Sequence, residues 1–463
     1  MKPDLSVDLE TLKRFDRPGP RYTSYPTAVE FHDGVGADAY RRGLVEVDAA
    51  DPDAPLSLYV HLPFCVERCL FCACNVVISP NPQPAVRYLE YLKREIDLVA
   101  AELPRRRKVV QLHWGGGTPT YFTPDQLAEL YRHIASRFKV VDGAEVAIEV
   151  DPCVTSDAHL ERLAELGFNR LSLGVQDFTA EVQAAVERNQ TYEQTSDLLA
   201  KAREIGFGEG INFDLIYGLP GQGLETFARS LERVLELQPD RLAVYSFAYV
   251  PWLKAHQRKI DPNTLPSPDV KLELYLSALR TLSSAGYEAI GMDHFALPDD
   301  ELAEASRQGR LSRNFMGYTV KPATAAVAFG ITGIGDLGNG YFQNHKKLST
   351  YYADLDAGRL PVEKGVLLDQ DDKLRRWVIT QLMCNFKVDK AQVRELFGVD
   401  FDECFRDNLG KLDELQDEGF VRDRPDRLEV LGAGRLFVRC IAMVFDRYLE
   451  AAMKGRPVFS RTV

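Results

Sequence analysis

Short apolar runs alternate with amphipathic segments over roughly 240 residues of the chain, which is typical of β-strands joined by helices into a parallel sheet. Each run is bounded by polar or turn-forming residues. We expect strands that begin at six positions: Ser57, Val109, Glu145, Arg170, Ile211 and Arg241.

Helical periodicity separates these runs. Between the first two runs, apolar residues recur every three to four positions, which places them on one face of a helix that packs on the sheet: Val86, Leu89, Leu92, Ile96 and Val99. The segment Thr123-Pro124-Asp125-Gln126 resembles a capping box with proline at the first helical position, so it marks the start of another helix.

Six strand–helix units predict an α/β fold, a partial (β/α)6 TIM-like barrel, in which ligands bind at the carboxyl ends of the strands. A cysteine-rich run follows the first expected strand, and Gly115-Gly116-Gly117-Thr118 follows the second. Glu149 and Asp151 end the third strand, and Asp214 lies in the fifth. We therefore expect the functional groups on one rim of the barrel.

The rhythm changes at about residue 367 to helices, expected over 374–384, 391–397 and 401–418. A hairpin around residues 422–427 and a helix from Ala433 follow, an arrangement similar to a winged helix. The predicted domains are an N-terminal arm (1–50), a catalytic β/α barrel with its extension (51–366) and a mainly helical C-terminal domain (367–463).

Composition and charge narrow the classes of function. The chain has 463 residues, of which 45% are hydrophobic and 27% charged, as in ordinary globular proteins. A formal charge of -12 argues against nucleic-acid binding. The longest weakly polar stretch, Ala323 to Gly335, is too short and glycine-rich to cross a membrane. The start of the chain lacks a signal-peptide core, so we expect a cytoplasmic protein. We also expect a monomer.

Cys65, Cys69 and Cys72 stand at the spacing C-x3-C-x2-C. Cysteine thiolates are the usual ligands of a four-iron cluster, and three of them leave one iron open for a small molecule. A disulfide framework, a zinc knuckle or simple packing are the alternatives. Four further cysteines are isolated and are interpreted as packing residues: Cys153, Cys384, Cys404 and Cys440.

The three cysteines, with Phe71 just before the last one, resemble the signature of the radical S-adenosylmethionine (SAM) superfamily. The resemblance implies a 4Fe-4S cluster whose open iron binds SAM, and whose electron cleaves SAM to a 5′-deoxyadenosyl radical. The cofactor supplies the chemistry, and the protein positions it.

A narrower resemblance is to the oxygen-independent coproporphyrinogen III oxidase family. It is carried by segments from the arm, the barrel and the region beyond it: Arg21-Tyr22-Thr23-Ser24-Tyr25-Pro26, Tyr59-Val60-His61-Leu62-Pro63-Phe64-Cys65, Cys72-Ala73-Cys74-Asn75, His113-Trp114-Gly115-Gly116-Gly117-Thr118-Pro119-Thr120, Gly174-Val175-Gln176-Asp177-Phe178, Asp214-Leu215-Ile216-Tyr217-Gly218-Leu219-Pro220, Gly291-Met292-Asp293-His294-Phe295 and Arg313-Asn314-Phe315.

This resemblance implies an oxidoreductase of haem and porphyrin biosynthesis, a coproporphyrinogen dehydrogenase. It would oxidatively decarboxylate two propionates of coproporphyrinogen III to vinyl groups, giving protoporphyrinogen IX without oxygen. The radical abstracts hydrogen from the β-carbon of each propionate, and carbon dioxide and one electron then leave. An electron donor and an electron acceptor of unknown identity are needed.

The resemblance also implies roles for single residues. Cys65, Cys69 and Cys72 would be the cluster ligands, and Cys74 would not be one. The cluster-bound SAM would be held by Tyr59, Phe71, Gly116 and Glu149. A second SAM molecule would be held by Gly117, Thr118, Gln176, Arg188, Asp214 and Ala248, with Ile334 as a further contact. Tyr59, Phe315 and Met316 would lie at the reacting centre.

The resemblance does not assign the residues that hold the propionates of the substrate. Arg21 could pair with a propionate or anchor the arm, and both interpretations stay open. Many family members carry glutamine where this chain has Met316, which offers only a weak acceptor. Two related functions are therefore alternatives: a haem-degrading radical SAM methyltransferase and a haem chaperone.

Overall fold

The computed structural model describes residues 5–208, 210–454, 459, 461 and 462, and the chain forms two compact units. One unit comprises residues 31–281 and 321–367, which we call the barrel unit. The other comprises residues 1–30, 282–320 and 368–463, which we call the terminal unit. The predicted domain boundaries at residues 50 and 366 stay a prediction.

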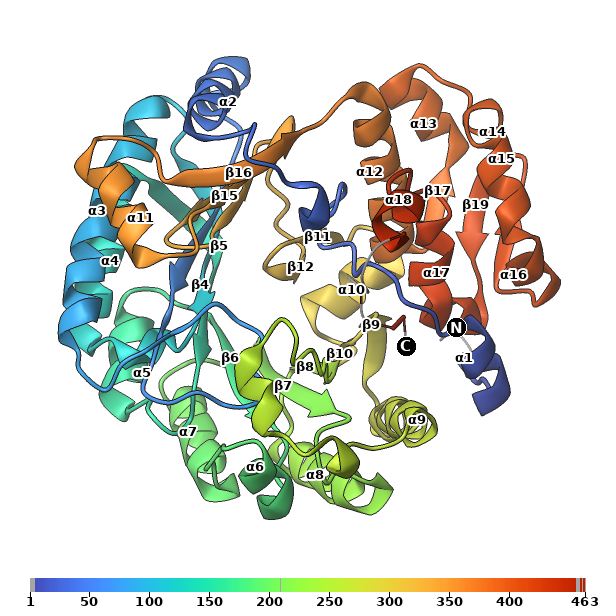
Figure 1. Cartoon of the computed structure of the whole chain (residues 1–463), viewed down its shortest axis with the longest axis horizontal. Helices are drawn as coiled ribbons and strands as arrows, with labels where there is room; N and C mark the ends of the chain where they lie inside the picture. The colour runs from blue at the N-terminus through green and yellow to red at the C-terminus, as the bar shows by residue number, and fades with distance from the viewer. Residues whose placement is uncertain (1–4, 209, 455–458, 460, 463) are drawn as a thin grey trace. The chain divides into compact units, whose positions relative to one another are not determined.

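The barrel unit is built on parallel strands in sequential order, each pairing with the next (Figure 1). These strands are β1 (Leu56–Leu62), β4 (Lys108–Gly116), β5 (Lys139–Val150), β6 (Arg170–Gln176), β7 (Ile211–Tyr217) and β8 (Arg241–Ser246). The predicted starts at Arg170, Ile211 and Arg241 are confirmed, and those at Ser57 and Val109 are one residue late. The start at Glu145 is wrong, because β5 begins six residues earlier and passes through Gly143 with a left-handed φ of 72°.

Further strands continue the sheet beyond β1. They are β13 (Ala325–Phe329), which is parallel to β1, and the antiparallel β14 (Ile334–Asp336), β15 (Gly340–Asn344) and β16 (Val362–Leu367). Within the described part of this unit the order runs from β16 to β8 and does not return to its first strand, so the barrel is partial, as predicted. Short strands β2 (Phe64–Cys65) and β3 (Val77–Ile78) pair across the cysteine run.

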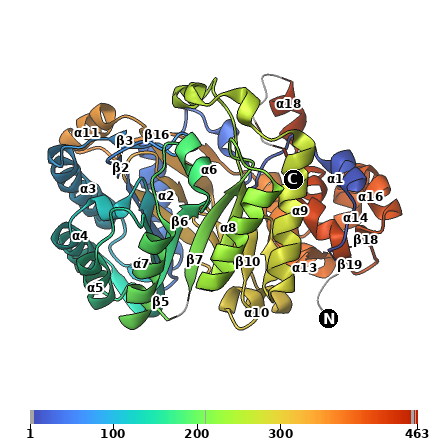
Figure 2. The ribbon, with the colours of Figure 1, turned by 90° about the horizontal axis from the view of Figure 1, so that it is seen from below.

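Amphipathic helices lie along the outside of the parallel strands, and Figure 2 shows α7 and α8 against them. The helices of this unit are α2 (Ala37–Ala50), α3 (Gln83–Glu102), η2 (Pro119–Tyr121), α4 (Pro124–Arg137), α5 (Asp157–Glu165), α6 (Ala180–Ala185), α7 (Tyr192–Glu204), α8 (Leu224–Leu237), η3 (Ala255–Lys259), η4 (Pro262–Thr264), α9 (Pro268–Ser284) and α11 (Leu348–Asp356). The predicted capping box at Thr123 is confirmed, since its hydroxyl accepts from the Gln126 N–H.

A buried carboxylate ties α3 to the turn after β13. Glu95 is 1% exposed and accepts hydrogen bonds from Gly330 N (2.7 Å), Asn344 Nδ2 (2.6 Å) and the Tyr351 hydroxyl (2.6 Å). Burial nevertheless raises the pKa of Glu95 to about 7. The protonation of Glu95 is therefore linked to the stability of this unit.

The terminal unit combines the N-terminal arm, a middle segment and the C-terminal helices. Its elements are α1 (Leu9–Phe15), η1 (Ala28–Glu30), β9 (Glu288–Gly291), β10 (His294–Ala296), α10 (Glu301–Gln308), β11 (Ser312–Asn314), β12 (Gly317–Thr319), α12 (Gln370–Asn385), β17 (Lys387–Asp389), α13 (Lys390–Phe397), α14 (Phe401–Cys404), α15 (Arg406–Leu409), η5 (Gly410–Leu412), α16 (Asp413–Asp417), β18 (Val421–Asp423), β19 (Arg427–Val430), η6 (Gly432–Phe437), α17 (Val438–Met443) and α18 (Leu449–Met453). The predicted hairpin is confirmed as β18 and β19, which pair antiparallel.

Two predictions for the C-terminal helices are corrected. The single helix expected over 401–418 is four short helical pieces, interrupted after Cys404 and at Gly410. The helix expected from Ala433 begins as the 3-10 helix η6 and becomes α-helical only at Val438. Phe405, at the break after Cys404, is fully buried, so the apolar side chains stay inside although the helix is interrupted.

The arm is bound to the C-terminal helices inside the terminal unit. The buried guanidinium of Arg439 donates to the carbonyls of Gly19, Pro20 and Arg461. Arg21 forms an ion pair with Asp293, and Arg313 donates to the Arg21 carbonyl at 2.8 Å. Arg21 thus has an anchoring partner in this structure.

None of the helices in the described part of the chain is long and apolar enough to cross a bilayer. The cysteines are free thiols. Cys384 and Cys440 are buried, as packing residues should be, but Cys153 and Cys404 are exposed, so the packing interpretation is wrong for those two.

Candidate functional site

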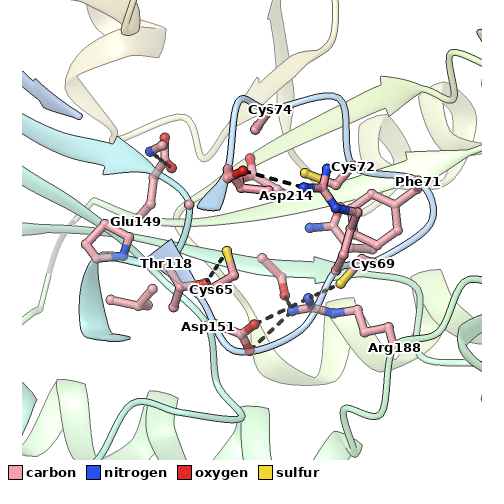
Figure 3. A pocket seen from close by; sticks show the side chains of 18 of the residues that line it. Cys65, Cys69, Phe71, Cys72, Cys74, Thr118, Glu149, Asp151, Arg188 and Asp214 are labelled. Carbon is pink, nitrogen blue, oxygen red and sulfur yellow. Dashed lines mark hydrogen bonds and ion pairs between the residues drawn. The ribbon is translucent and has the colours of Figure 1, made fainter. Parts of the chain in front are cut away.

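A cavity of about 310 Å³ lies at the carboxyl ends of the parallel strands of the barrel unit (Figure 3). Its wall contains the cysteine loop, the glycine turn after β4 and polar side chains from β5, β6 and β7. The lining residues are Cys65, Glu67, Arg68, Cys69, Phe71, Cys72, Cys74, Val76, Gly116, Gly117, Thr118, Pro119, Glu149, Val150, Asp151, Ser172, Gly174, Gln176, Arg188, Asp214 and Tyr245.

Backbone contacts fix the cysteine loop over the barrel. Leu70 N donates to the Val186 carbonyl at 2.9 Å, and His256 Nε2 donates to the Cys72 carbonyl at 2.8 Å. Leu70 is buried with apolar residues that follow β6, β7 and β8, and Phe71 packs against the same cluster. The loop is therefore held on both sides, which limits the freedom of its three sulfurs.

The cysteine sulfurs have different neighbours. Cys65 Sγ lies 3.4 Å from Thr118 Oγ1, and Arg188 Nη1 donates to Cys69 Sγ at 3.7 Å. Burial raises the pKa of Cys65 to about 11, and burial also raises the pKa of Cys69 against the opposing charge of Arg188. If these two thiols bind a metal, its binding would have to supply the free energy that keeps them ionised.

The three cysteines fit an iron–sulfur cluster better than a single ion. All three line the cavity from one loop. Among the described residues, no three or more Cys, His, Asp or Glu side chains converge as ligands of one metal ion. A cluster is ligated at separate irons, so its ligand sulfurs need not meet at one point.

The glycine turn lets the backbone approach its neighbours closely. Gly116 has φ of 118°, and a Cβ there would lie 2.5 Å from the ring of His61. A Cβ on Gly117 would lie 2.6 Å from the Pro63 carbonyl. Only glycine fits at Gly116 without strain, because the left-handed backbone and the contact both exclude a side chain.

Glu149 projects from the end of β5 toward this turn. Its Oε2 accepts from Gly116 N at 3.0 Å, and its Oε1 lies 3.5 Å from His113 Nε2. Burial opposes ionisation, but hydrogen bonds from His113 and Gly116 outweigh it and lower the pKa of Glu149. The cavity thus contains an ionised carboxylate at neutral pH.

Asp214 in β7 is a second carboxylate of different character. It accepts from Ser172 Oγ and Asn212 Nδ2, each at 3.0 Å. Burial, and then the negative charge of Glu149, raise the pKa of Asp214 to about 6. The two carboxylates therefore titrate in separate ranges, with Asp214 the one closer to neutral pH.

Arg188 is the buried cation of the cavity wall. Its guanidinium lies 3.5 Å from the carboxylate of Asp151, donates through Nε to the Gln190 amide oxygen at 2.9 Å, and donates to the Gly174 carbonyl. Asp151 raises the pKa of Arg188 against the effect of burial. This guanidinium is held rigidly, with one nitrogen turned toward Cys69.

The structure brings most of the predicted cofactor residues together in the cavity wall, but not all. Tyr59 is absent from the lining; its hydroxyl lies 3.0 Å from His61 Nδ1. Ala248, which accepts from Gln257, and Ile334, the first residue of β14, are also absent from it. Phe315 and Met316 belong to the terminal unit.

Some lining residues were not predicted as site residues. Asp151, which follows β5 directly, was expected on the rim but was given no role in binding. Arg68 lies inside the cysteine run, so its position in the sequence alone indicates that it is close to the predicted cluster ligands. Ser172 and Tyr245 gave no such signal. His61 is fixed by the Asn75 carbonyl at 3.1 Å, which no local pattern reveals.

Family models match two parts of the chain. The model of the radical SAM superfamily matches residues 59–234, and that of the HemN C-terminal domain matches residues 368–437. The first match contains all of the predicted cluster ligands.

The curated relatives match over nearly the whole chain. A protein named oxygen-independent coproporphyrinogen III oxidase from Helicobacter pylori (strain J99) is 44% identical, and the alignment covers 99% of this chain and 100% of that protein. The protein of the same name from Escherichia coli (strain K12) is 44% identical, with 98% of each chain covered.

A solved structure of coproporphyrinogen III oxidase (HemN) from Escherichia coli, described as a radical SAM enzyme, superposes with a TM-score of 0.91. It is 43% identical, and the match covers 96% of this chain and all of that one.

Proposed function

The chain belongs to the family of oxygen-independent coproporphyrinogen III oxidases, radical SAM enzymes of haem biosynthesis, and we propose how its residues serve that reaction. The enzyme decarboxylates coproporphyrinogen III oxidatively to protoporphyrinogen IX. The observation that supports the residue assignment is that three cysteines, an ionised carboxylate, a glycine turn and a buried arginine line one cavity.

Cys65, Cys69 and Cys72 would hold a 4Fe-4S cluster with one iron open. When bound, the cluster supplies the electron that cleaves SAM to methionine and a 5′-deoxyadenosyl radical. Arg188 beside Cys69 favours the thiolate form of that ligand. Thr118 beside Cys65 can donate a hydrogen bond to its thiolate.

Glu149 and the glycine turn would hold the cluster-bound SAM, together with Phe71 and Tyr59. The Glu149 carboxylate is ionised and opens onto the cavity, which suits an ammonium or a ribose hydroxyl. Gly116 allows a ligand to lie against the backbone because no side chain stands in its place.

A second SAM molecule would suit a reaction that removes two carboxyl groups. Gly117, Thr118, Gln176, Arg188 and Asp214 line the same cavity and would contact it, with Ala248 and Ile334 as the remaining assigned positions. Gln176 has φ of 67°, an unusual left-handed conformation for a non-glycine residue. Such strain is common where a side chain must be aimed at a ligand.

In each turn, one C–H bond at the propionate β-carbon would break, and its hydrogen atom would pass to the deoxyadenosyl radical. The C–C bond to the carboxylate would then break, so that carbon dioxide leaves, a vinyl group forms and one electron passes to an acceptor. Phe315 and Met316 would lie near the reacting propionate.

We further propose that the enzyme acts as a monomer in the cytoplasm, where its free cysteines stay reduced.

The test is anaerobic turnover of coproporphyrinogen III with the reconstituted cluster, SAM, dithionite and an electron acceptor, followed by mass spectrometry of the porphyrins. Two successive losses of a carboxyl group are expected. A product that gains a methyl group would instead identify a methyltransferase, and transfer of intact haem without SAM cleavage would identify a chaperone.

A further inference from the structure

Two large apolar side chains are exposed side by side in the turn after β8. Trp252 is 57% exposed and Leu253 is 69% exposed. They are the most exposed of the turn's apolar residues, whereas the neighbouring Gln257 and Ile260 are buried. Scattered exposed apolar residues need no explanation, but an adjacent tryptophan and leucine on a short turn are typical of a contact surface.

Cations surround this pair in a chain of formal charge -12. Residues 250–260 include Lys254, Arg258 and Lys259 and contain no Asp or Glu. His256 of the same turn donates to the Cys72 carbonyl, so the turn contacts the cysteine loop, which carries a further cation, Arg68. We call Arg68, Trp252, Leu253, Lys254 and Arg258 the basic–apolar surface.

Acidic residues offset only part of this charge. Lys259 is paired with Glu187 at 3.1 Å, and Glu67 lies in the cysteine loop next to Arg68. Asp261 follows the turn directly, so the four cations Arg68, Lys254, Arg258 and Lys259 exceed the three anions by one positive charge. The local field is therefore opposite in sign to that of the whole chain.

The turn that carries this surface contacts the backbone of the cysteine loop. His256 Nε2 donates to the carbonyl of Cys72 at 2.8 Å, and Gln257 Nε2 donates to the carbonyl of Phe71 at 3.5 Å. Gln257 is fixed in turn, because its Oε1 accepts from Val250 N at 2.6 Å. A protein bound to Trp252 and Leu253 would therefore contact the same turn whose His256 is hydrogen-bonded to Cys72, a proposed cluster ligand.

We propose that the basic–apolar surface docks an acidic one-electron donor protein that carries a flavin or an iron–sulfur group of low potential. The inference rests on the proposed function, which requires one electron for each SAM molecule cleaved. The donor loses one electron and the cluster gains it. Charge complementarity would steer the encounter, and the two apolar side chains would hold the complex.

The experiment uses reduced flavodoxin as the probe and dithionite as the small-molecule reductant. Two double variants are compared with the parent holoenzyme: Trp252→Ser with Leu253→Ser, and Lys254→Glu with Arg258→Glu. The matched control is Leu224→Ser with Arg229→Glu, an exposed leucine and an exposed arginine on α8. Binding of oxidised flavodoxin is measured by calorimetry, and deoxyadenosine formation is measured with each reductant.

We expect both surface variants to bind flavodoxin about tenfold more weakly and to need about tenfold more flavodoxin for half-maximal SAM cleavage. Their dithionite-driven rate should equal that of the parent enzyme. Parent binding should also weaken when ionic strength rises to about 0.15 M. The control variant should match the parent in every measurement.

Unchanged flavodoxin binding in both variants, or equal weakening in the control, would overturn the proposal. An equal loss with both reductants would also overturn it, because the turn would then support the cysteine loop rather than a partner. Failure of the parent enzyme to cleave SAM with dithionite would reject the proposed function itself, a result distinct from all of these.

Discussion

Replacing Glu149 with glutamine tests the proposed SAM site most directly. The substitution keeps the size of the side chain and one oxygen that can accept from Gly116 N, which lies 3.0 Å from Glu149 Oε2 in the parent protein. It removes the negative charge and turns an amide N–H₂ toward either His113 or the ligand. The structure of the turn should therefore survive, while the charge-assisted bond to an ammonium or hydroxyl is lost.

The expected magnitude follows from the loss of one charge-assisted hydrogen bond, which costs roughly 1.5–3 kcal/mol. At about 1.4 kcal/mol per factor of ten, SAM should bind the variant roughly 10- to 150-fold more weakly. Anaerobic calorimetry on cluster-loaded enzyme measures this directly, and the iron content should not change.

Glu145→Gln is the matched control. Glu145 lies four residues earlier on the same strand, where its Oε1 accepts from Gln111 Nε2 at 2.7 Å, an interaction that glutamine can keep. This variant should bind SAM as the parent does. Unchanged affinity in Glu149→Gln, or the same loss in Glu145→Gln, would remove Glu149 from the SAM site.

Three further predictions concern the glycine turn, the cluster and the buried carboxylate of α3. Gly116→Ala should weaken SAM binding roughly 5- to 150-fold, since strain of this kind costs about 1–3 kcal/mol and the new Cβ meets His61. Gly143→Ala, at a left-handed φ of 72° but with open space around it, should not change SAM affinity. Cys69→Ala should lose the cluster, whereas Cys404→Ala should keep about four irons by colorimetric iron assay; equal iron in both would exclude Cys69 as a ligand. The pKa of Glu95 is raised to about 7 in the folded protein, so the protonated carboxyl stabilises the fold. This contribution to the free energy of unfolding is complete below about pH 4.5 and is lost as the pH rises through 7, a decrease of about 3 kcal/mol. Denaturant titrations should show Glu95→Gln gaining that amount relative to the parent between pH 5 and about 8, and a difference that does not vary with pH would contradict the assignment.

The parallel strands could be predicted because each is a short apolar run that ends in polar or glycine residues. Arg170, Ile211 and Arg241 each follow a turn, so the strand starts are marked locally. The start of β5 could not be found in this way, since Asp142 and Gly143 interrupt the apolar pattern without ending the strand. A left-handed glycine inside a strand is a local irregularity that pairing with β4 accommodates.

The C-terminal helices show a different limit. Phe401, Phe405, Leu412 and Leu415 are buried and spaced as they would be on one continuous helix, which is why residues 401–418 were predicted as one. The burial is real, but the backbone between them is broken at Gly410 and after Cys404. Periodicity reports which side chains are buried, and it does not report whether the backbone hydrogen bonds run without interruption.

The cofactor half of the site was accessible to sequence reasoning because its residues stand at consecutive strand ends of one unit. In a parallel sheet those ends meet at one edge, so the cysteine loop after β1, the glycine turn after β4 and Glu149 on β5 must come together whatever the connecting helices do. Phe315 and Met316 follow no such rule, because they lie in a short hairpin of the terminal unit between β11 and β12. The strand order therefore gives no support for their assignment to the reacting centre, which stays a prediction from the family resemblance.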